Sequence, residues 1–130
     1  MKQLVFIVLA PKRPLMVAMF RASKAKEISE FFDVSLEEDE VAIYFLGTSG
    51  IIARTSQTSV IFDPAGMLKK DEIATAKPLE LVLFTHDHLD HFNGRDSKAI
   101  FEASNAQIVA EAKVADKLKG QIPVEKLVSA

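Results

Sequence analysis

The sequence has no cysteine and no tryptophan among its 130 residues. Without cysteine the chain has no disulfide framework, no thiolate metal site and no cysteine nucleophile, and its redox compartment is left open. The sequence also lacks a large excess of positive or negative charge. It has 16 lysines and arginines and 18 aspartates and glutamates, which give a formal net charge of −2. That balance gives no electrostatic attraction to nucleic acid or to an anionic membrane surface, and we expect neither as a partner.

A long apolar run is missing as well. The run at residues 4–10 is far shorter than the roughly 20 apolar residues that span a bilayer. Lys12 and Arg13 follow it closely, without a small-residue cleavage site. We therefore interpret the run as a buried strand or a short helix rather than a signal peptide, and we expect a cytoplasmic protein.

The composition is typical of a globular domain, with 48% hydrophobic and 26% charged residues. Its first third predicts a helix that begins near Pro14, because apolar residues then recur at spacings of three and four. These residues are Leu15, Met19, Ala22, Ala25, Ile28, Phe31 and Phe32. An acidic linker follows at residues 33–40. We predict a division into an N-terminal helical extension with its linker, residues 1–40, and a half-domain, residues 41–130.

Residues 41–63 have the pattern of β-strands. Apolar runs at 41–46, 51–54 and 59–62 are separated by turn signals, of which the glycine-rich segment 47–50 is the clearest. The last run stops at Asp63, which precedes a proline and is therefore biased towards an extended backbone. These features predict an antiparallel meander.

Residues 70–119 predict alternating helices and strands. Strands at 79–84 and 107–110 flank a helix that Asp96 or Ser97 can cap, an arrangement that favours parallel pairing. Shorter helices are expected at 70–74 and 111–119. The predicted fold class is therefore α+β, a mixed sheet with flanking helices and an N-terminal helical segment.

Histidine is scarce, and all three histidines lie together. They follow the apolar run 79–84 directly, in the segment Thr85-His86-Asp87-His88-Leu89-Asp90-His91. Neutral imidazole and carboxylate are ligands that bind a zinc-like ion without redox chemistry. A solvated polar loop is the alternative interpretation, but the length of the motif and its position at a strand end favour a metal site.

The spacing within this segment indicates how an ion would be held. His86 and His88 are two residues apart, so in an extended segment both imidazoles project to the same side. Asp90 and His91 come one short turn later. They can bind a second ion, or Asp90 can hold the water that the first ion polarises, which makes Asp90 the candidate catalytic residue. Asp87 should point away from the two histidines.

Three segments in this order resemble the metallo-β-lactamase superfamily. They are residues 46–50, residues 59–64 and the histidine segment, and the resemblance covers about residues 41–130. Residues 62–64 are most similar to the lactonase-like hydrolases of that superfamily, whereas residues 47–50 are also similar to its tRNA 3′-processing nucleases. The resemblance implies one half of an αββα sandwich and one or two zinc ions, with iron or manganese as alternatives.

The resemblance also implies roles for single residues. Those that match His86 and His88 bind the first metal, and those that match Asp90 and His91 bind the second. The residue that matches Asp63 supports the histidine segment from outside the ligand shell, and we place Thr85 beside it in that role.

The sequence departs from the superfamily in one respect. Complete members take further ligands from a second, similar half, whereas here no histidine follows His91. We therefore expect half a metal site, and a sheet face that needs a cover. The cover can be a second copy in a homodimer, a chain that carries the C-terminal half, or residues 1–32 folded back. The homodimer is preferred because two-fold oligomers are the commonest.

Two classes of function remain open at this stage. The first is a hydrolase in which metal-bound hydroxide attacks an ester, a lactone or a related bond of a small molecule. The second is a non-catalytic metal-binding fragment, or half of a split or truncated protein. An RNA-processing nuclease is a further alternative, which the acidic balance of the chain disfavours.

Overall fold

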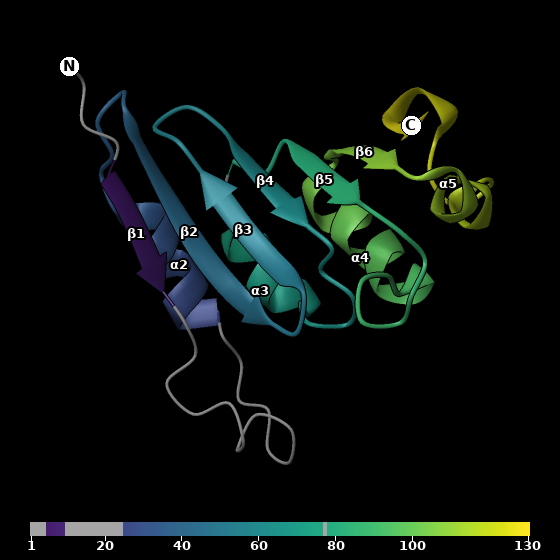
Figure 1. Cartoon of the computed structure of the whole chain (residues 1–130), viewed down its shortest axis with the longest axis horizontal. Helices are drawn as coiled ribbons and strands as arrows, with labels where there is room; N and C mark the ends of the chain where they lie inside the picture. The colour runs from purple at the N-terminus through teal and green to yellow at the C-terminus, as the bar shows by residue number, and fades with distance from the viewer. Residues whose placement is uncertain (1–4, 10–24, 77) are drawn as a thin grey trace, which may run out of the picture.

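A computed structural model describes residues 5–9, 25–76 and 78–130 of the chain (Figure 1). These residues form a seven-stranded mixed sheet whose strands lie in their order along the chain. The strands are β1 (Val5–Leu9), β2 (Glu40–Gly47), β3 (Gly50–Arg54), β4 (Ser59–Phe62), β5 (Leu81–Phe84), β6 (Gln107–Ala110) and β7 (Leu127–Ser129). The helices are α2 (Ala25–Asp33), α3 (Lys70–Thr75), α4 (Gly94–Ser104), α5 (Ala112–Leu118) and the 3₁₀ turn η1 (Val124–Lys126).

The sheet combines two pairing patterns. Strands β2, β3 and β4 form the antiparallel meander that the sequence predicts, and the turn between β2 and β3 falls at the expected glycines. Strands β4, β5, β6 and β7 are parallel, with α4 connecting β5 to β6 as the predicted βαβ unit. The α+β prediction of a mixed sheet with flanking helices is confirmed.

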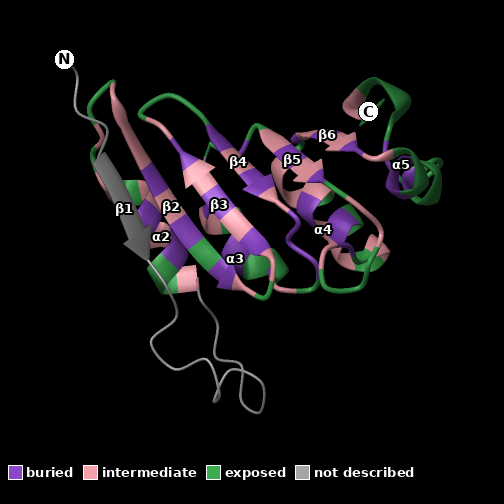
Figure 2. Ribbon diagram, in the orientation of Figure 1, coloured by how far each residue is buried: buried purple, intermediate pink, exposed green. Residues whose placement is uncertain are grey.

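The core lies between one face of the sheet and the helices. Helices α2, α3 and α4 lie behind the sheet in Figure 1. Their fully buried side chains include Ile28, Ile73 and Ile100, and alternate strand residues such as Ile61 and Val82 face them. Figure 2 shows this alternation of buried and half-buried residues along the strands. Burial of alternate residues is the expected consequence of the two-residue period of a strand.

The N-terminal third is described in part. Strand β1 pairs in parallel with β2, and α2 contributes Ile28 and Phe31 to the core. The helix predicted from Pro14 is present from Ala25, and its earlier portion lies outside the described residues. The division into two units at residue 40 stays a prediction.

Several predicted boundaries were wrong. The side chain that caps α4 is Asn93, which accepts a hydrogen bond from the backbone N–H of Asp96 at 3.1 Å, so the helix begins earlier than a cap at Asp96 or Ser97 allows. The strand expected from Leu79 begins at Leu81. Strand β7 and the turn η1 were not predicted. None of the helices within the described residues is long and apolar enough to cross a membrane.

Candidate metal centre

The candidate site forms where parallel strands end. Strands β4 and β5 are neighbours and run in the same direction, so the residues that follow them meet at one edge of the sheet. Asp63 follows β4, and Thr85 begins the histidine loop (residues 85–92) that follows β5. The loop closes on itself because the carbonyl of His88 accepts hydrogen bonds from the backbone N–H groups of His91 and Phe92, at 2.9 and 2.8 Å.

Asp63 anchors the histidine loop. Its carboxylate accepts a hydrogen bond from the backbone N–H of Thr85 at 2.8 Å and another from the Thr85 hydroxyl at 2.6 Å. The same carboxylate is 3.0 Å from Nδ1 of His91. Burial would raise the pKa of Asp63, but the hydrogen bonds from Thr85 and His91 outweigh it and lower that pKa. Asp63 is therefore an anionic acceptor that fixes two residues of the loop.

The extended backbone predicted for Asp63 from the proline that follows it was wrong. Its φ of 43° lies in the left-handed region, which aspartate and asparagine tolerate better than most residues because their short polar side chains bond locally. A hydrogen bond to β5 holds this backbone in place, because the N–H of Asp63 donates to the carbonyl of Leu83 at 2.9 Å. This geometry turns the carboxylate towards the loop after β5.

The hydrogen bonds assign the tautomers of two histidines. An ionised carboxylate only accepts, so Nδ1 of His91 carries the proton that bonds to Asp63. The single hydroxyl proton of Thr85 is given to Asp63, so the Thr85 oxygen accepts from Nδ1 of His86, which is 2.9 Å away. In their neutral form, both imidazoles therefore present the lone pair of Nε2, and Nε2 of His91 lies 3.5 Å from the Asp90 carboxylate. Such partners on the other ring nitrogen are typical of metal-binding histidines.

Three potential ligands converge in the loop. His86, Asp90 and His91 each offer one ligand atom, and these atoms lie within 4.8 Å of one another. The rings of His86 and His91 are 3.8 Å apart between centroids. His88 is not part of this cluster, although its ring centroid is 4.5 Å from that of His86. The prediction that His86 and His88 bind a first ion together, with Asp90 and His91 binding a second, stays a prediction.

Asp87 faces away from the cluster. Its carboxylate accepts a hydrogen bond from Nζ of Lys117 on α5 at 2.8 Å. That hydrogen bond, together with the positive charge of Lys117, lowers the pKa of Asp87. The contact ties the histidine loop to α5 and agrees with the expectation that Asp87 points away from the histidines.

Ser49 was missed by the sequence interpretation. It lies in the turn between β2 and β3, and its hydroxyl is 3.1 Å from Nε2 of His91. In the neutral imidazole with its proton on Nδ1, Nε2 accepts and the Ser49 hydroxyl is the donor. The glycine-rich turn 47–50 was a weak signal, and nothing in the sequence shows that it reaches a residue 42 positions away.

Comparison with known families agrees with this geometry. A family model described as the beta-lactamase superfamily domain matches residues 60–130, which is more than half of the chain. The chain belongs to the metallo-β-lactamase superfamily. The match begins in β4 and contains Asp63 and the whole histidine loop, so it includes every site residue predicted above. A comparison with curated proteins found no significant match.

The donors of this superfamily member fit a divalent metal ion. Two Nε2 lone pairs and one carboxylate are the nitrogen and oxygen ligands that zinc accepts, and iron and manganese accept them too. The residues that would hold an ion are His86, His91 and Asp90, with His88 close by.

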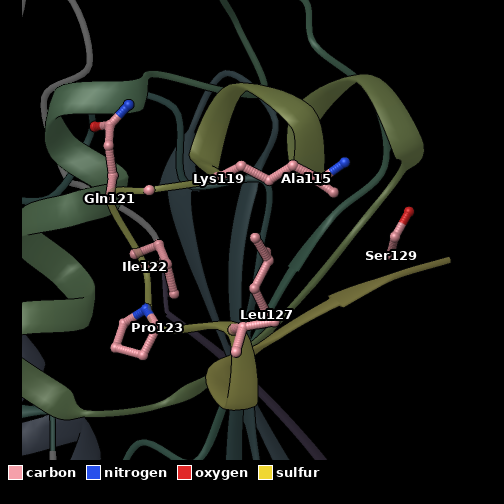
Figure 3. A pocket seen from close by; sticks show the side chains of 9 residues that line it. Ala115, Lys119, Gln121, Ile122, Pro123, Leu127 and Ser129 are labelled. Carbon is pink, nitrogen blue, oxygen red and sulfur yellow. The ribbon is translucent and has the colours of Figure 1, made fainter.

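A separate groove lies away from the metal-binding loop. It has a volume of about 530 Å³ and runs between α5 and β7, where Ile122, Pro123 and Leu127 give it a mainly apolar lining (Figure 3). It contains none of the histidines or aspartates of the site. The candidate site is therefore the histidine loop and not this groove.

Proposed function

We propose that this chain is a metal-dependent hydrolase that cleaves an ester, a lactone or a related bond of a small molecule. The observation that supports it is the pair of histidines whose Nδ1 atoms are held by Thr85 and Asp63, with Asp90 beside them. This arrangement turns Nε2 of His86 to an ion, and Nε2 of His91 becomes a ligand atom once the Ser49 hydroxyl gives way. Zinc is the preferred ion, because it suits these donors and needs no redox partner.

The residues of the chain have distinct tasks in this proposal. His86, His88, Asp90 and His91 bind one or two ions, and Asp63 and Thr85 hold the imidazoles in the tautomer that binds. An ion bound there would supply hydroxide near neutral pH, because such ions lower the pKa of water to about 7. The Asp90 carboxylate, next to the two imidazoles, is placed to accept a proton at this point and to orient the attacking group towards the substrate carbonyl.

A partner surface completes the proposed site. A catalytic zinc takes about three protein ligands and water, and a second ion needs more than the cluster offers. The additional ligands come from a second copy of the chain or from a chain that carries the C-terminal half of the fold.

The first test is metal content. Purified protein is expected to retain about one zinc-like ion per chain by elemental analysis. In the double variant His86→Ala, His88→Ala, bound metal should fall several-fold while the circular dichroism spectrum stays unchanged, because both side chains are partly exposed. Asp116→Ala, an exposed aspartate on α5, is the control and should retain the metal.

Activity distinguishes the alternatives. The metal-loaded protein is expected to hydrolyse simple esters or lactones and to leave single-stranded RNA intact. Metal that is bound without any hydrolysis would make the chain a non-catalytic metal-binding module. RNA cleavage would favour the nuclease-like alternative, and unchanged metal content in the double histidine variant would contradict the assigned site.

A further inference from the structure

Two candidate ligands lie in an exposed part of the histidine loop. His88 and Asp90 are both exposed, and Leu89 between them is 90% exposed. Side-chain packing therefore does little to hold residues 88–90 in one conformation, and such segments are mobile unless other contacts fix them. The contacts that hold the neighbouring residues decide whether the two ligands are in place when an ion arrives.

The three imidazoles of the loop are not held equally. Two of them, His86 and His91, have hydrogen-bond partners on Nδ1. The His88 imidazole makes no hydrogen bond to any of the residues that the structure describes, and its ring lies 4.5 Å from that of His86 between centroids. The position of His88 therefore depends on how the backbone around it is held.

One residue of α5 contacts both ends of this exposed segment. Nζ of Lys117 donates to the carboxylate of Asp87, the residue directly before His88, at 2.8 Å. The same Nζ lies 5.9 Å from the centre of the Phe92 ring, a distance at which an ammonium group is attracted to the aromatic face. Asp87 and Phe92 flank residues 88–91, so one ammonium group links the two ends of the segment that carries the ligands.

Both sides of this link are anchored in the core. Helix α5 is held by Val114 and Leu118, neither of which has any exposed surface. The residue before the helix is tied to the end of β5, because the backbone N–H of Glu111 donates to the carbonyl of Phe84 at 3.0 Å. Phe92 is 5% exposed and packs edge to face on Phe84, with 5.3 Å between the ring centroids. Lys117 therefore holds the exposed segment from a fixed point.

We propose that Lys117 is a positioning residue, which orders the exposed segment and so places His88 and Asp90 for an ion. The inference deepens the proposed function and rests on it for the ion itself. The Lys117 side chain is 52% exposed, and exposed ion pairs add little to the stability of a fold. Its effect should therefore appear in the order of the loop and in ion binding, because a segment that is ordered in advance loses less conformational freedom when the ion binds.

The first measurement is backbone order in the metal-free chain, from ¹⁵N relaxation. Lys117→Met keeps an unbranched stem and removes the ammonium group. The order parameters of amides 87–90 should fall by at least about 0.1, towards the values below about 0.6 that are typical of flexible segments. Lys119→Met is the matched control, because it removes the same charge two residues away, from a side chain that bonds to Asp116. It should leave amides 87–90 unchanged.

The second measurement is zinc affinity, from competition with a chromophoric chelator. Lys117→Met should bind zinc about two- to fivefold more weakly, which is the range that the loss of one exposed ion pair can produce. Lys119→Met should bind zinc at least as tightly as wild type, because the loss of a positive charge by itself favours a cation. Lys117→Arg keeps the charge and a donor for Asp87, and it should restore both measurements to wild-type values.

Asp87→Ala removes the same contact from the side of the loop and tests the proposal if Lys117→Met fails to fold. Its amides 88–90 should lose as much order as those of Lys117→Met, and the double variant should lose no more, because both changes break one interaction. Unchanged loop order in both single variants would overturn the proposal, and so would equal zinc affinity of Lys117→Met and Lys119→Met. Wild-type protein that binds no zinc would contradict the proposed function, whereas the order parameters decide the role of Lys117 without metal.

Discussion

Asp63 is the residue on which the geometry of the candidate site depends. It accepts from the backbone and hydroxyl of Thr85 and from His91, and it is 5% exposed. Asn has the same shape and also tolerates the left-handed backbone, so Asp63→Asn removes the charge without adding strain. Its amide nitrogen would face the donors of Thr85 or His91. We expect the free energy of unfolding to fall by about 1–2 kcal/mol, because at least one partly buried donor then lacks an acceptor.

The pH dependence of this difference is a sharper test than its size. The pKa of Asp63 is lowered in the folded protein, so its contribution is fully present above the unfolded value of 3.8 and is lost as the pH falls through the folded pKa. In urea unfolding with a chelator present, wild type and Asp63→Asn should therefore differ at pH 6 and converge below pH 3.8. Asp116→Asn, on the exposed side of α5, should match wild type throughout. A difference that stayed constant with pH would show that the charge of Asp63 has no stabilising role.

For single residues, the sequence predicts which ligands lie close together but not how their side chains are oriented. The four candidate ligands lie within six residues, so their proximity could be predicted from spacing alone. The tautomers could not, because they depend on Thr85 bonding to Asp63, which is 22 residues away. The contact between Ser49 and His91 was equally hidden, since it depends on how the β2–β3 turn meets the histidine loop.

At the scale of elements, α2 depends on a residue of the sheet. The helix has nine residues, which is too short to be stable alone, and it has no basic residue in its last turn. Arg54, at the end of β3, donates hydrogen bonds to carbonyl groups at the C-terminal end of α2. Its Nε donates to the carbonyl of Phe31 at 3.0 Å, and its terminal nitrogen donates to the carbonyl of Val34. The guanidinium group thus satisfies carbonyls at the C-terminus of the helix, where a positive charge is favourable.

Arg54→Met tests this link between α2 and the sheet. Methionine keeps an unbranched apolar stem of similar length but offers no hydrogen-bond donors to the two carbonyls. We expect a loss of about 1–3 kcal/mol in the free energy of unfolding by urea. Amide hydrogen exchange should become faster in α2 than in α4, because the loss is local. Arg95→Met, an exposed arginine on α4, should change stability by less than about 0.5 kcal/mol. An equal loss in both variants would mean that Arg54 has no special role.

The elements themselves were largely predictable from local pattern. Strands β2 to β6 are apolar runs bounded by turns or helix signals, and their pairing follows from connection length. Strand β7 was missed because its three residues follow a 3₁₀ turn and show no clear alternation. The cap of α4 was misplaced because Asn93 and Asp96 are both good caps, and only the structure shows that Asn93 accepts the hydrogen bond from Asp96.

At the scale of the whole molecule, the strands are apolar on both of their faces. Continuous apolar runs are typical of strands that are covered on both sides, whereas the described helices cover one side only. What covers the second face, opposite α2, α3 and α4, cannot be deduced from local pattern, because a second copy and a complementary half would select the same apolar residues. Association therefore has to be measured together with stability.

Concentration dependence of unfolding provides that measurement. If folding is coupled to dimerisation, then a 100-fold dilution lowers the stability by about 2.7 kcal/mol of dimer. For a 260-residue dimer, at about 2.1 cal/mol/K of unfolding entropy per residue, the apparent Tm should fall by about 5 °C. Phe45 of β2 is 38% exposed, and Phe45→Lys should unfold at a lower Tm that does not change on dilution, because the monomer is then the unfolding species. Val124 in η1 is 86% exposed, and Val124→Lys should follow wild type. A wild-type Tm independent of concentration would mean that the chain unfolds as a monomer, and its stability would then have to come from contacts within one chain.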